Sequence, residues 1–357
     1  MFFRTVKQIS FNKTFSTIYL KKIILSVLKV LIFLSLGILL IWLAVRNLTE
    51  NDKAEITKSL TEANYIWVVF SMICGILAHL SRAIRWRILL NTLGFNPKTE
   101  TTFYAVMIGY LGNLALPRLG EVLRCGILKR YENIPITSSL GTVIAERIID
   151  LFFLFVLFIL SLFIEYKRMH NYINENILHP IKNKLQTIAD SNFLMVIIVI
   201  TVLLLLLFTL RKRIRSNPFA GKIKELAIGF FNGIKTVAKV DKPMAFIFHS
   251  FFIWAMYLMS VYISVFTFKE TESMSLTDCL AIMCFGSLGV IATPGGIGAY
   301  QWIVLQIMLL WGYTTSIGVA FGWVVWLSQT AVVLIVGLLS FALLAINEKK
   351  KVNAAAA

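Results

Sequence analysis

Two short stretches, GNLALPRLG at residues 112–120 and GVIATPGGIG at residues 289–298, govern how this chain is expected to fold. Each lies near the middle of an apolar run, about 101–130 and 276–311, and breaks it with proline and glycine. The arms on either side are too short to cross a bilayer comfortably, because a spanning helix needs about 20 residues. We therefore expect two re-entrant helical hairpins, each of which enters and leaves the membrane on one side.

The rest of the chain has the composition of a polytopic membrane protein. Of its 357 residues, 58% are apolar and 15% are charged, whereas soluble domains average about 45–50% and about 25%. A soluble core of this size could not bury so much apolar surface, which excludes most soluble enzyme folds. The predicted fold class is an all-α integral membrane helical bundle. The expected spans are roughly 23–45, 65–81, 136–164, 193–210, 243–267 and 315–346.

The basic residues, which give a net charge of +17, indicate orientation. With the N-terminus in the cytosol, the cytosolic segments carry 24 Lys and Arg against 5 Asp and Glu, and the external segments carry 8 against 10. This asymmetry predicts that both termini lie in the cytosol, and we expect the protein in the bacterial inner (plasma) membrane. A version with ten spans, in which each hairpin is two thin spans, would place the loops on the same sides.

The predicted organisation is a basic cytosolic segment 1–22, a transmembrane domain 23–346 and a cytosolic tail 347–357. Within the domain, residues 218–242 have apolar residues at helical spacing and lysines on the other faces. This pattern predicts a basic amphipathic helix in the headgroup layer, although a plain stop-transfer anchor explains the preceding Arg/Lys run equally well. No aromatic-interleaved basic motif is present, so we expect no nucleic-acid partner.

The two halves of the predicted domain have the same order of elements in opposite orientation. Each half has a span, a hairpin and a second span, and Gly, Ala and Pro of residues 112–117 align with those of residues 289–294. Inverted repeats whose broken helices meet near the midplane are typical of transporters. A helix end exposed at such a break offers free N–H groups to an anion such as phosphate.

Six ionisable residues lie inside the predicted membrane segments or at their edge. Each charge at a helix centre costs roughly 2.5–3.5 kcal/mol, so these residues should pair or face water. We expect the first hairpin to pack its charges against those of the span 136–164, either as a structural ion-pair network or as a polar cavity for a lipid headgroup. The six residues are Arg118, Glu121, Arg124, Glu146, Arg147 and Asp150.

The span 65–81 is followed by Arg82, Arg85 and Trp86. Basic and aromatic side chains at the end of a span are typical of snorkelling anchors and of the aromatic belt. We expect them at the cytosolic interface, where contact with a lipid phosphate is the alternative role.

Four motifs follow one another along the chain. They are Arg82-x-x-Arg85-Trp86, Pro117-x-x-Gly120-Glu121-x-x-Arg124, Glu146-Arg147-x-x-Asp150 and Pro294-Gly295-Gly296-Ile297-Gly298. In this order they resemble the lysylphosphatidylglycerol synthase transmembrane (flippase-like) family, over about residues 20–346. In the family's large members, this membrane domain precedes a soluble aminoacyl-transferase domain and is taken to move aminoacylated phospholipid between leaflets. The resemblance implies a stand-alone member, for which we expect no synthase activity.

The chain departs from the family pattern after the second break, where an acidic residue is usual and this sequence has Gln301. An anionic or neutral lipid therefore fits as well as an aminoacylated one. The residues expected around the transported headgroup are Arg118, Glu121, Arg124, Glu146, Arg147, Asp150, Pro117, Gly120, Pro294, Gly295, Gly298 and Gln301.

The sequence thus predicts a lipid flippase-like transporter for a phospholipid or a polyprenyl-phosphate-linked lipid, and not an enzyme. We expect membrane lipids as its partners, namely anionic phospholipid or polyprenyl phosphate, and neither a cofactor nor a metal. Two alternatives stay open. One is an integral-membrane glycosyl- or acyltransferase with a polyprenyl-phosphate donor and a buried carboxylate as base. The other is a non-transporting membrane protein that anchors a partner enzyme.

Overall fold

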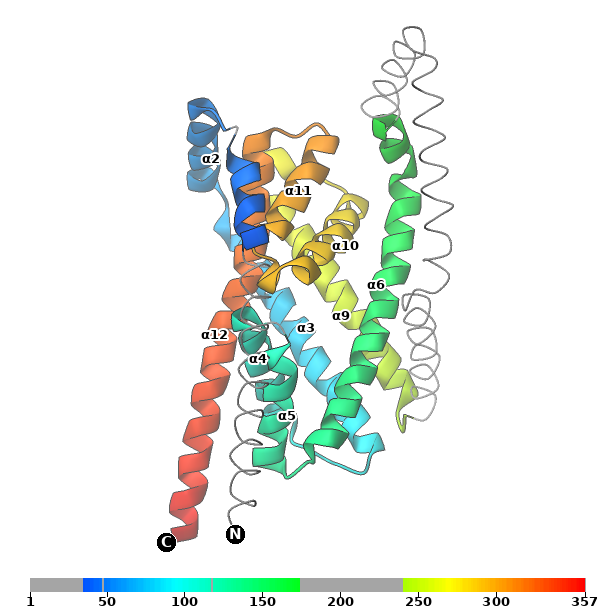
Figure 1. Cartoon of the computed structure of the whole chain (residues 1–357), viewed down its shortest axis with the longest axis vertical. Coiled ribbons are helices and arrows are strands. Elements are labelled where there is room, and N and C mark those ends of the chain that lie inside the picture. The colour runs from blue at the N-terminus through cyan, green and yellow to red at the C-terminus, as the bar shows by residue number, and fades with distance from the viewer. Residues whose placement is uncertain (1–34, 47, 117, 174–239, 357) are drawn as a thin grey trace, which may run out of the picture.

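The computed structural model describes residues 35–46, 48–116, 118–173 and 240–356, and the regular elements in these ranges are all helices (Figure 1). The predicted all-α class is confirmed. Four of the described helices are long and apolar enough to cross a membrane. They are α3 (Tyr65–Thr92), α6 (Ile136–Ile173), α9 (Pro243–Ser264) and α12 (Thr315–Ala356).

These four helices correspond to four of the six predicted spans. The predicted segment 1–22, the span 193–210 and nearly all of the amphipathic helix 218–242 lie outside the described residues. Of the span 23–45, the described part is an apolar helix, Ser35–Val45. One described helix, α2 (Glu50–Glu62), was not predicted; a capping box between Thr49 and Asp52 begins it, and it buries no residue.

Both predicted breaks occur as breaks between paired helices. The first separates α4 (Thr99–Ala115) from α5 (Leu119–Glu132). The second separates α10 (Leu276–Ala292) from α11 (Ala299–Leu310), with the short 3₁₀ turn η4 (Pro294–Gly296) between them. The helices of each pair pack against each other. That each pair enters and leaves on one side of a bilayer stays a prediction.

The first arm of each pair ends in the same way. The backbone N–H of Leu116 donates to the carbonyl of Gly112 at 3.0 Å, and that of Thr293 donates to the carbonyl of Gly289 at 3.2 Å. Both residues after the last helical turn are extended. These glycines are the ones that align between the halves of the sequence, so the likeness at sequence level marks equivalent helix ends.

The packing of the helices repeats between the halves as well. In the first half α3 contacts α4, and α5 contacts α6; in the second, α9 contacts α10, and α11 contacts α12. The halves also exchange contacts, because α6 packs on α10 and α12 packs on α4. Figure 1 shows α4 and α5 in the lower half of the molecule and α10 and α11 in the upper half. The described helices therefore have the arrangement expected of an inverted repeat.

The tips of the two helix pairs meet near the middle of the molecule. A Cβ atom at Gly295 would lie 3.0 Å from the Leu114 side chain, and the Trp326 indole donates to the Gly295 carbonyl at 2.8 Å. The apolar helix Ser35–Val45 covers the second tip, where a Cβ atom at Gly298 would lie 2.0 Å from the Gly37 carbonyl oxygen. Protein thus surrounds the second break, and its unpaired backbone groups are kept away from hydrocarbon, where they would be costly.

Two helices run past the spans predicted for them, although both predicted spans lie within candidate membrane spans. Helix α3 runs to Thr92 rather than residue 81, so Arg82, Arg85 and Trp86 lie inside it. Helix α12 continues to Ala356 through the predicted cytosolic tail. In both places charged residues suggested an end, but lysine and arginine are good helix formers and end a helix only where backbone and solvent also demand it.

Candidate functional site

Five charged side chains from three helices meet in the interior. Arg82 and Arg85, three residues apart, share one face of α3, and Glu146 and Asp150, four apart, share one face of α6. Arg124 comes from α5. Each of the five residues is at most 9% exposed, and Arg85 and Glu146 are completely buried. Helix α5 and helix α3 thus present three guanidinium groups to two carboxylates.

The ion pairs within this cluster are short. Arg82 Nη1 lies 2.7 Å from Glu146 Oε1 and 2.5 Å from Asp150 Oδ2, and Arg85 Nη2 lies 2.6 Å from Asp150 Oδ1. Arg85 also donates to the Ser250 hydroxyl of α9 at 3.2 Å. Charges this deep are tolerated only when paired and hydrogen-bonded, and removing one partner leaves an uncompensated buried charge.

Arg124 is the least satisfied member of the cluster. Its Nη1 lies 3.1 Å from Glu146 Oε2, and its guanidinium lies over the Trp86 ring, 4.6 Å from the ring centre. Its Nε and Nη2 atoms are buried and have no hydrogen-bond partner. With three arginines against two carboxylates, the cluster carries a formal charge of +1. Arg124 therefore presents unused donors and surplus positive charge.

The prediction that Arg82, Arg85 and Trp86 are snorkelling interfacial anchors was wrong. Trp86 is completely buried, and its indole N–H donates to the Thr142 hydroxyl of α6 at 2.9 Å. The two arginines turn inward because Glu146 and Asp150 lie opposite them on α6, which sequence spacing cannot reveal. Contact of these residues with a lipid phosphate stays a prediction.

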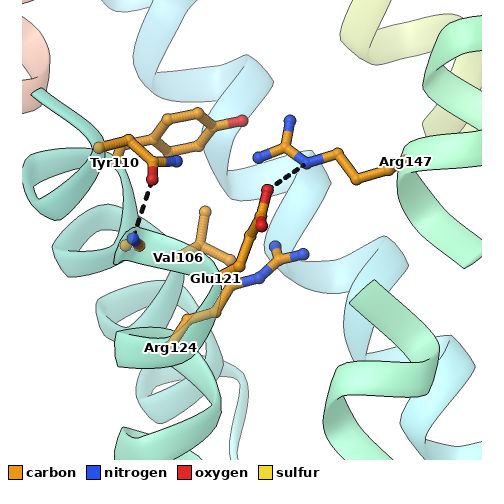
Figure 2. Close-up of a pocket in the computed structure, with 8 residues that line it drawn as sticks. Val106, Tyr110, Glu121, Arg124 and Arg147 are labelled. Atoms are coloured by element: carbon orange, nitrogen blue, oxygen red, sulfur yellow. Dashed lines mark hydrogen bonds and ion pairs between the residues drawn. The ribbon is translucent and has the colours of Figure 1, made fainter. Parts of the chain in front are cut away.

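A small pocket lies beside the cluster, between α4, α5 and α6. Figure 2 shows Tyr110, Glu121, Arg124 and Arg147 around it, with the Glu121 carboxylate turned toward Arg147. Arg147 Nε lies 3.6 Å from Glu121 Oε1, and both side chains are partly exposed. The cavity volume is about 10 Å³, about the space of one water. In this conformation the pocket reaches Arg124 but does not hold a headgroup.

The predicted pairing of the first hairpin with α6 was confirmed in part. Arg124 pairs with Glu146, and Glu121 pairs with Arg147. Asp150 pairs instead with the arginines of α3. Arg118 is exposed at the tip, in a left-handed conformation with φ of 69°, and has no ion pair among the described residues.

The remaining predicted site residues lie at the two breaks, and Pro117 is outside the described residues. Gly120 approaches α4 so closely that a Cβ atom would lie 1.8 Å from the Gly109 carbonyl oxygen. Gly295 and Gly298 have φ of 63° and 78°, conformations that favour glycine. Pro294 is the first residue of η4 and directly precedes Gly295.

Gln301, like Glu121 in α5, is the third residue of its helix. Its Oε1 accepts the backbone N–H of Gly298 at 2.8 Å, and its Nε2 atom is buried without a hydrogen-bond partner. It therefore caps α11, a role that an acidic residue could also fill.

A second charged cluster, which the sequence analysis missed, lies at the other end of α6. Arg168 Nη1 lies 2.5 Å from Asp278 Oδ1 of α10 and 3.7 Å from Glu165 Oε2 of α6 itself. Glu165 and Asp278 are buried, whereas the Arg168 side chain is 57% exposed. The sequence holds one signal for this cluster, the acidic residue Asp278 in the first turn of α10, which corresponds to a position near Thr101 of α4. Within the described part of the chain, no three His, Cys, Asp or Glu side chains lie close enough together to hold a metal ion.

Comparison with known proteins gives one family. The model of the lysylphosphatidylglycerol synthase TM region matches residues 26–337. The chain is 30% identical over 115 residues to the UPF0104 membrane protein MJ1595 of Methanocaldococcus jannaschii, covering 31% of this chain and 34% of that protein. It is 25% identical over 202 residues to MJ1078 of the same organism, covering 56% of this chain and 80% of that protein.

A third relative carries a different name. The chain is 32% identical over 117 residues to the glycosyltransferase AglD of Haloferax volcanii, covering 32% of this chain but 19% of that protein. The aligned segments thus span about a third or less of MJ1595 and AglD. No solved structure matches the chain significantly.

Proposed function

This chain belongs to the family of the lysylphosphatidylglycerol synthase TM region, and we propose that it is a flippase-like transporter, not an enzyme, that moves a lipid with an anionic phosphate headgroup between leaflets. The lipid is an anionic phospholipid or a polyprenyl-phosphate-linked lipid, and its acyl or prenyl tails stay in the bilayer while the headgroup passes between the helix pairs. The membrane is the plasma membrane, and both termini lie in the cytosol.

The single observation that supports this proposal most strongly is the surplus positive charge at Arg124. Its guanidinium is 4% exposed, has two nitrogens without hydrogen-bond partners and borders the Tyr110 and Arg147 pocket. Buried donors without partners are costly, and an anion that accepts from them removes this cost. A phosphate suits a guanidinium particularly well because it can accept two hydrogen bonds from it.

The surroundings of the pocket support a passing headgroup rather than a permanent one. Glu121 and Arg147 form a loose, partly exposed pair at its mouth, and the exposed Arg118 lies at the nearby tip. A headgroup phosphate could replace the Glu121 carboxylate as the partner of Arg147. Because the cavity is now too small for a headgroup, transport requires the helix pairs to move apart.

The test is leaflet transfer in proteoliposomes made from the purified full chain. Fluorescent phosphatidylglycerol, phosphatidylethanolamine and a short polyprenyl phosphate are compared, and a membrane-impermeant quencher reads the exposed fraction. We expect transfer of at least one of the two probes whose headgroup has no amine to neutralise the phosphate, namely phosphatidylglycerol and the polyprenyl phosphate. Transfer no faster than in empty vesicles for all three probes would overturn the proposal.

A substitution ties that transfer to the site. Arg124→Gln removes the unpartnered donors but leaves both carboxylates paired with Arg82 and Arg85, so the fold should persist. We expect transfer to slow by roughly tenfold, which corresponds to the loss of one charge-assisted hydrogen bond. Lys129→Gln removes a positive charge from an exposed position of the same helix and should leave transfer unchanged.

Glycosyl transfer is the second candidate, and the name of the relative AglD favours it. A transferase needs a carboxylate free to act as base, whereas Glu146 and Asp150 are each bound by two or more arginines. Release of sugar from a polyprenyl-phosphate sugar by the purified chain, lost in Glu121→Gln, would favour this candidate over transport.

A further inference from the structure

Two equivalent seams of the repeat differ in how they are held. The α6–α10 seam and the α12–α4 seam correspond to each other, since each joins the last helix of one half to the first hairpin arm of the other. If Gly112 and Gly289 are aligned, Asp278 at the start of α10 corresponds to Thr101 at the start of α4. The two seams can therefore be compared at matching positions.

The α6–α10 seam is closed by charge. Arg168 of α6 bonds to Asp278 Oδ1, while Asp278 Oδ2 accepts from the backbone N–H and the hydroxyl of Ser275 to cap α10. The Arg168 guanidinium also lies 5.9 Å from the centre of the Trp311 ring, next to the C-terminal end of α11. One partly exposed arginine thus ties α6 to the second hairpin.

The α12–α4 seam holds a cavity at the corresponding place. Its volume is about 310 Å³, and among the residues that line it are Thr101, Tyr104, Leu344 and Asn347. Among the side chains that the structure describes, which on α12 end at Asn347, no ion pair joins α4 and α12. One seam is therefore latched while its counterpart is open, which is the asymmetry that a transporter has when it faces one side of the membrane.

We infer that Arg168 is a gate latch with two alternative acceptors, Asp278 across the seam when the gate is closed and Glu165 on its own helix when it is open. This inference rests on the proposed transport. It places the gate on the side opposite the buried cluster around Glu146 and Asp150. Glu146 and Glu165 are 19 residues apart on α6, or about 29 Å at the rise of an α-helix. The latch and the buried cluster therefore lie at opposite ends of the helix.

Glu165 makes the latch reversible. Its Oε2 atom is buried, has no hydrogen-bond partner and lies 3.7 Å from Arg168 Nη1. When α10 moves away, Arg168 can turn to Glu165, which lies three residues earlier on the same helix and already faces it. Opening then exchanges one carboxylate for another, so both states keep one ion pair, and Asp278 keeps its hydrogen bonds from Ser275 after Arg168 leaves.

Ionic strength is the natural variable for this latch. The hydrogen bond to Asp278 raises the pKa of the Arg168 guanidinium above its usual range, so the guanidinium stays charged at every accessible pH. The side chain is more than half exposed, and added salt will screen the pair. Because both acceptors are carboxylates, salt should weaken the pair of each state and so reduce the effect that a substitution at the latch has on the width of the seam.

The test measures the width of the seam directly. Spin labels are attached at Phe163→Cys of α6 and Leu276→Cys of α10, both on exposed side chains, in a Cys74→Ser background, because the other three cysteines are buried. Pulsed electron resonance in nanodiscs gives the fractions of short and long distances. This readout needs no lipid transfer, so failure of the latch and failure of the proposed function can be told apart.

The two carboxylates should act in opposite directions. Asp278→Asn and Arg168→Gln remove the closed-state pair and should raise the long-distance fraction roughly two- to fivefold, the range for a partly exposed ion pair. Glu165→Gln removes the open-state acceptor and should lower that fraction roughly twofold. Ser275→Ala, which breaks the cap of α10 but keeps the latch, is the matched control and should leave the fraction unchanged.

A static structural role for the cluster predicts another result. If Glu165→Gln widens the seam as Asp278→Asn does, or if Arg168→Gln leaves the distances unchanged, Arg168 does not exchange between acceptors and the inference is wrong.

Discussion

Glu146 and Asp150, toward one end of α6, meet three arginines that are at most 4% exposed, whereas Arg168 toward the other end is 57% exposed and bonds to Asp278 of α10. The first cluster joins α6 to helices of its own half, and the second joins it to the other half. The formal charge is +1 in the first cluster and −1 among Glu165, Arg168 and Asp278. One helix thus has a buried attachment and a partly exposed one.

Burial is the property that separates the two. Charges removed from water need every partner, because a single unpaired ion costs several kcal/mol. A pair that water can reach is worth about 0–1 kcal/mol and can be exchanged at little cost. The difference predicts that α6 moves with the first half of the repeat and slides against the second. The predictions below test that division, beginning with the largest effect.

Substitution of Glu146 should destabilise the protein most. Glu146→Gln leaves Arg82, Arg85 and Arg124 with one carboxylate, and we expect a loss of about 3–5 kcal/mol in the free energy of unfolding. Thermal unfolding in detergent measures it as a fall in Tm. Glu165→Gln is the matched control at the other end of α6 and should cost about 1 kcal/mol or less. Equal falls in Tm would contradict the distinction between the clusters.

The close approach of α5 and α4 should be nearly as sensitive. Gly120→Ala places a methyl group 1.8 Å from the Gly109 carbonyl oxygen, so the helices must separate, at a cost of about 1–3 kcal/mol. Gly126→Ala, on the same helix with no atom within 4 Å of the added methyl group, should raise stability by up to about 1 kcal/mol. The two unfolding curves should therefore shift in opposite directions from that of the unsubstituted chain.

Loss of the exposed latch should have a small effect on stability that depends on salt. Arg168→Gln should cost less than about 1 kcal/mol at low salt. In 1 M salt, where the Debye length is about 3 Å, the variant and the unsubstituted chain should unfold at the same temperature. A difference in Tm that persists at high salt would show that Arg168 acts through packing rather than charge.

The smallest effect is expected at α2. Hydrogen bonds from the Thr49 backbone and hydroxyl lower the pKa of Asp52, which also accepts from Ser316 of α12. A lowered pKa in the folded state means that Asp52 stabilises the helix above its unfolded pKa and that this contribution is lost as the pH falls through the folded pKa. Amide protection of α2 should therefore fall in acid, and Asp52→Asn should abolish that dependence. Hydrogen exchange of residues 50–62 at two pH values measures it.

Much of the fold could be predicted because it follows from local chemistry. Apolar runs of spanning length, and breaks at Pro117 and Pro294, are properties of the sequence alone. The likeness of Gly112 and Gly289 marked equivalent helix ends, where each carbonyl accepts the backbone N–H of the residue four positions later. What local chemistry could not give was the end of α3, because the carboxylates that its arginines face lie on another helix.

The sequence indicated part of the charged cluster but not all of its partners. Spacing placed Glu146 and Asp150 on one face and joined Arg124 to Glu146, but it could not reveal that Arg82 and Arg85 turn inward, since that depends on how α3 packs on α6. The second charged cluster, around Arg168, was missed for the same reason. Arg168 and Asp278 are 110 residues apart, and each alone is an ordinary charge at the end of an apolar helix.

The contact between Gly37 and Gly298 sets the order in which the molecule can be completed. The first of these glycines is synthesised early and the second after most of the chain, yet a Cβ atom on either would collide with the backbone of the other segment. Membrane helices insert first and associate afterwards. The helix Ser35–Val45 therefore inserts well before the glycine that it must contact has been synthesised.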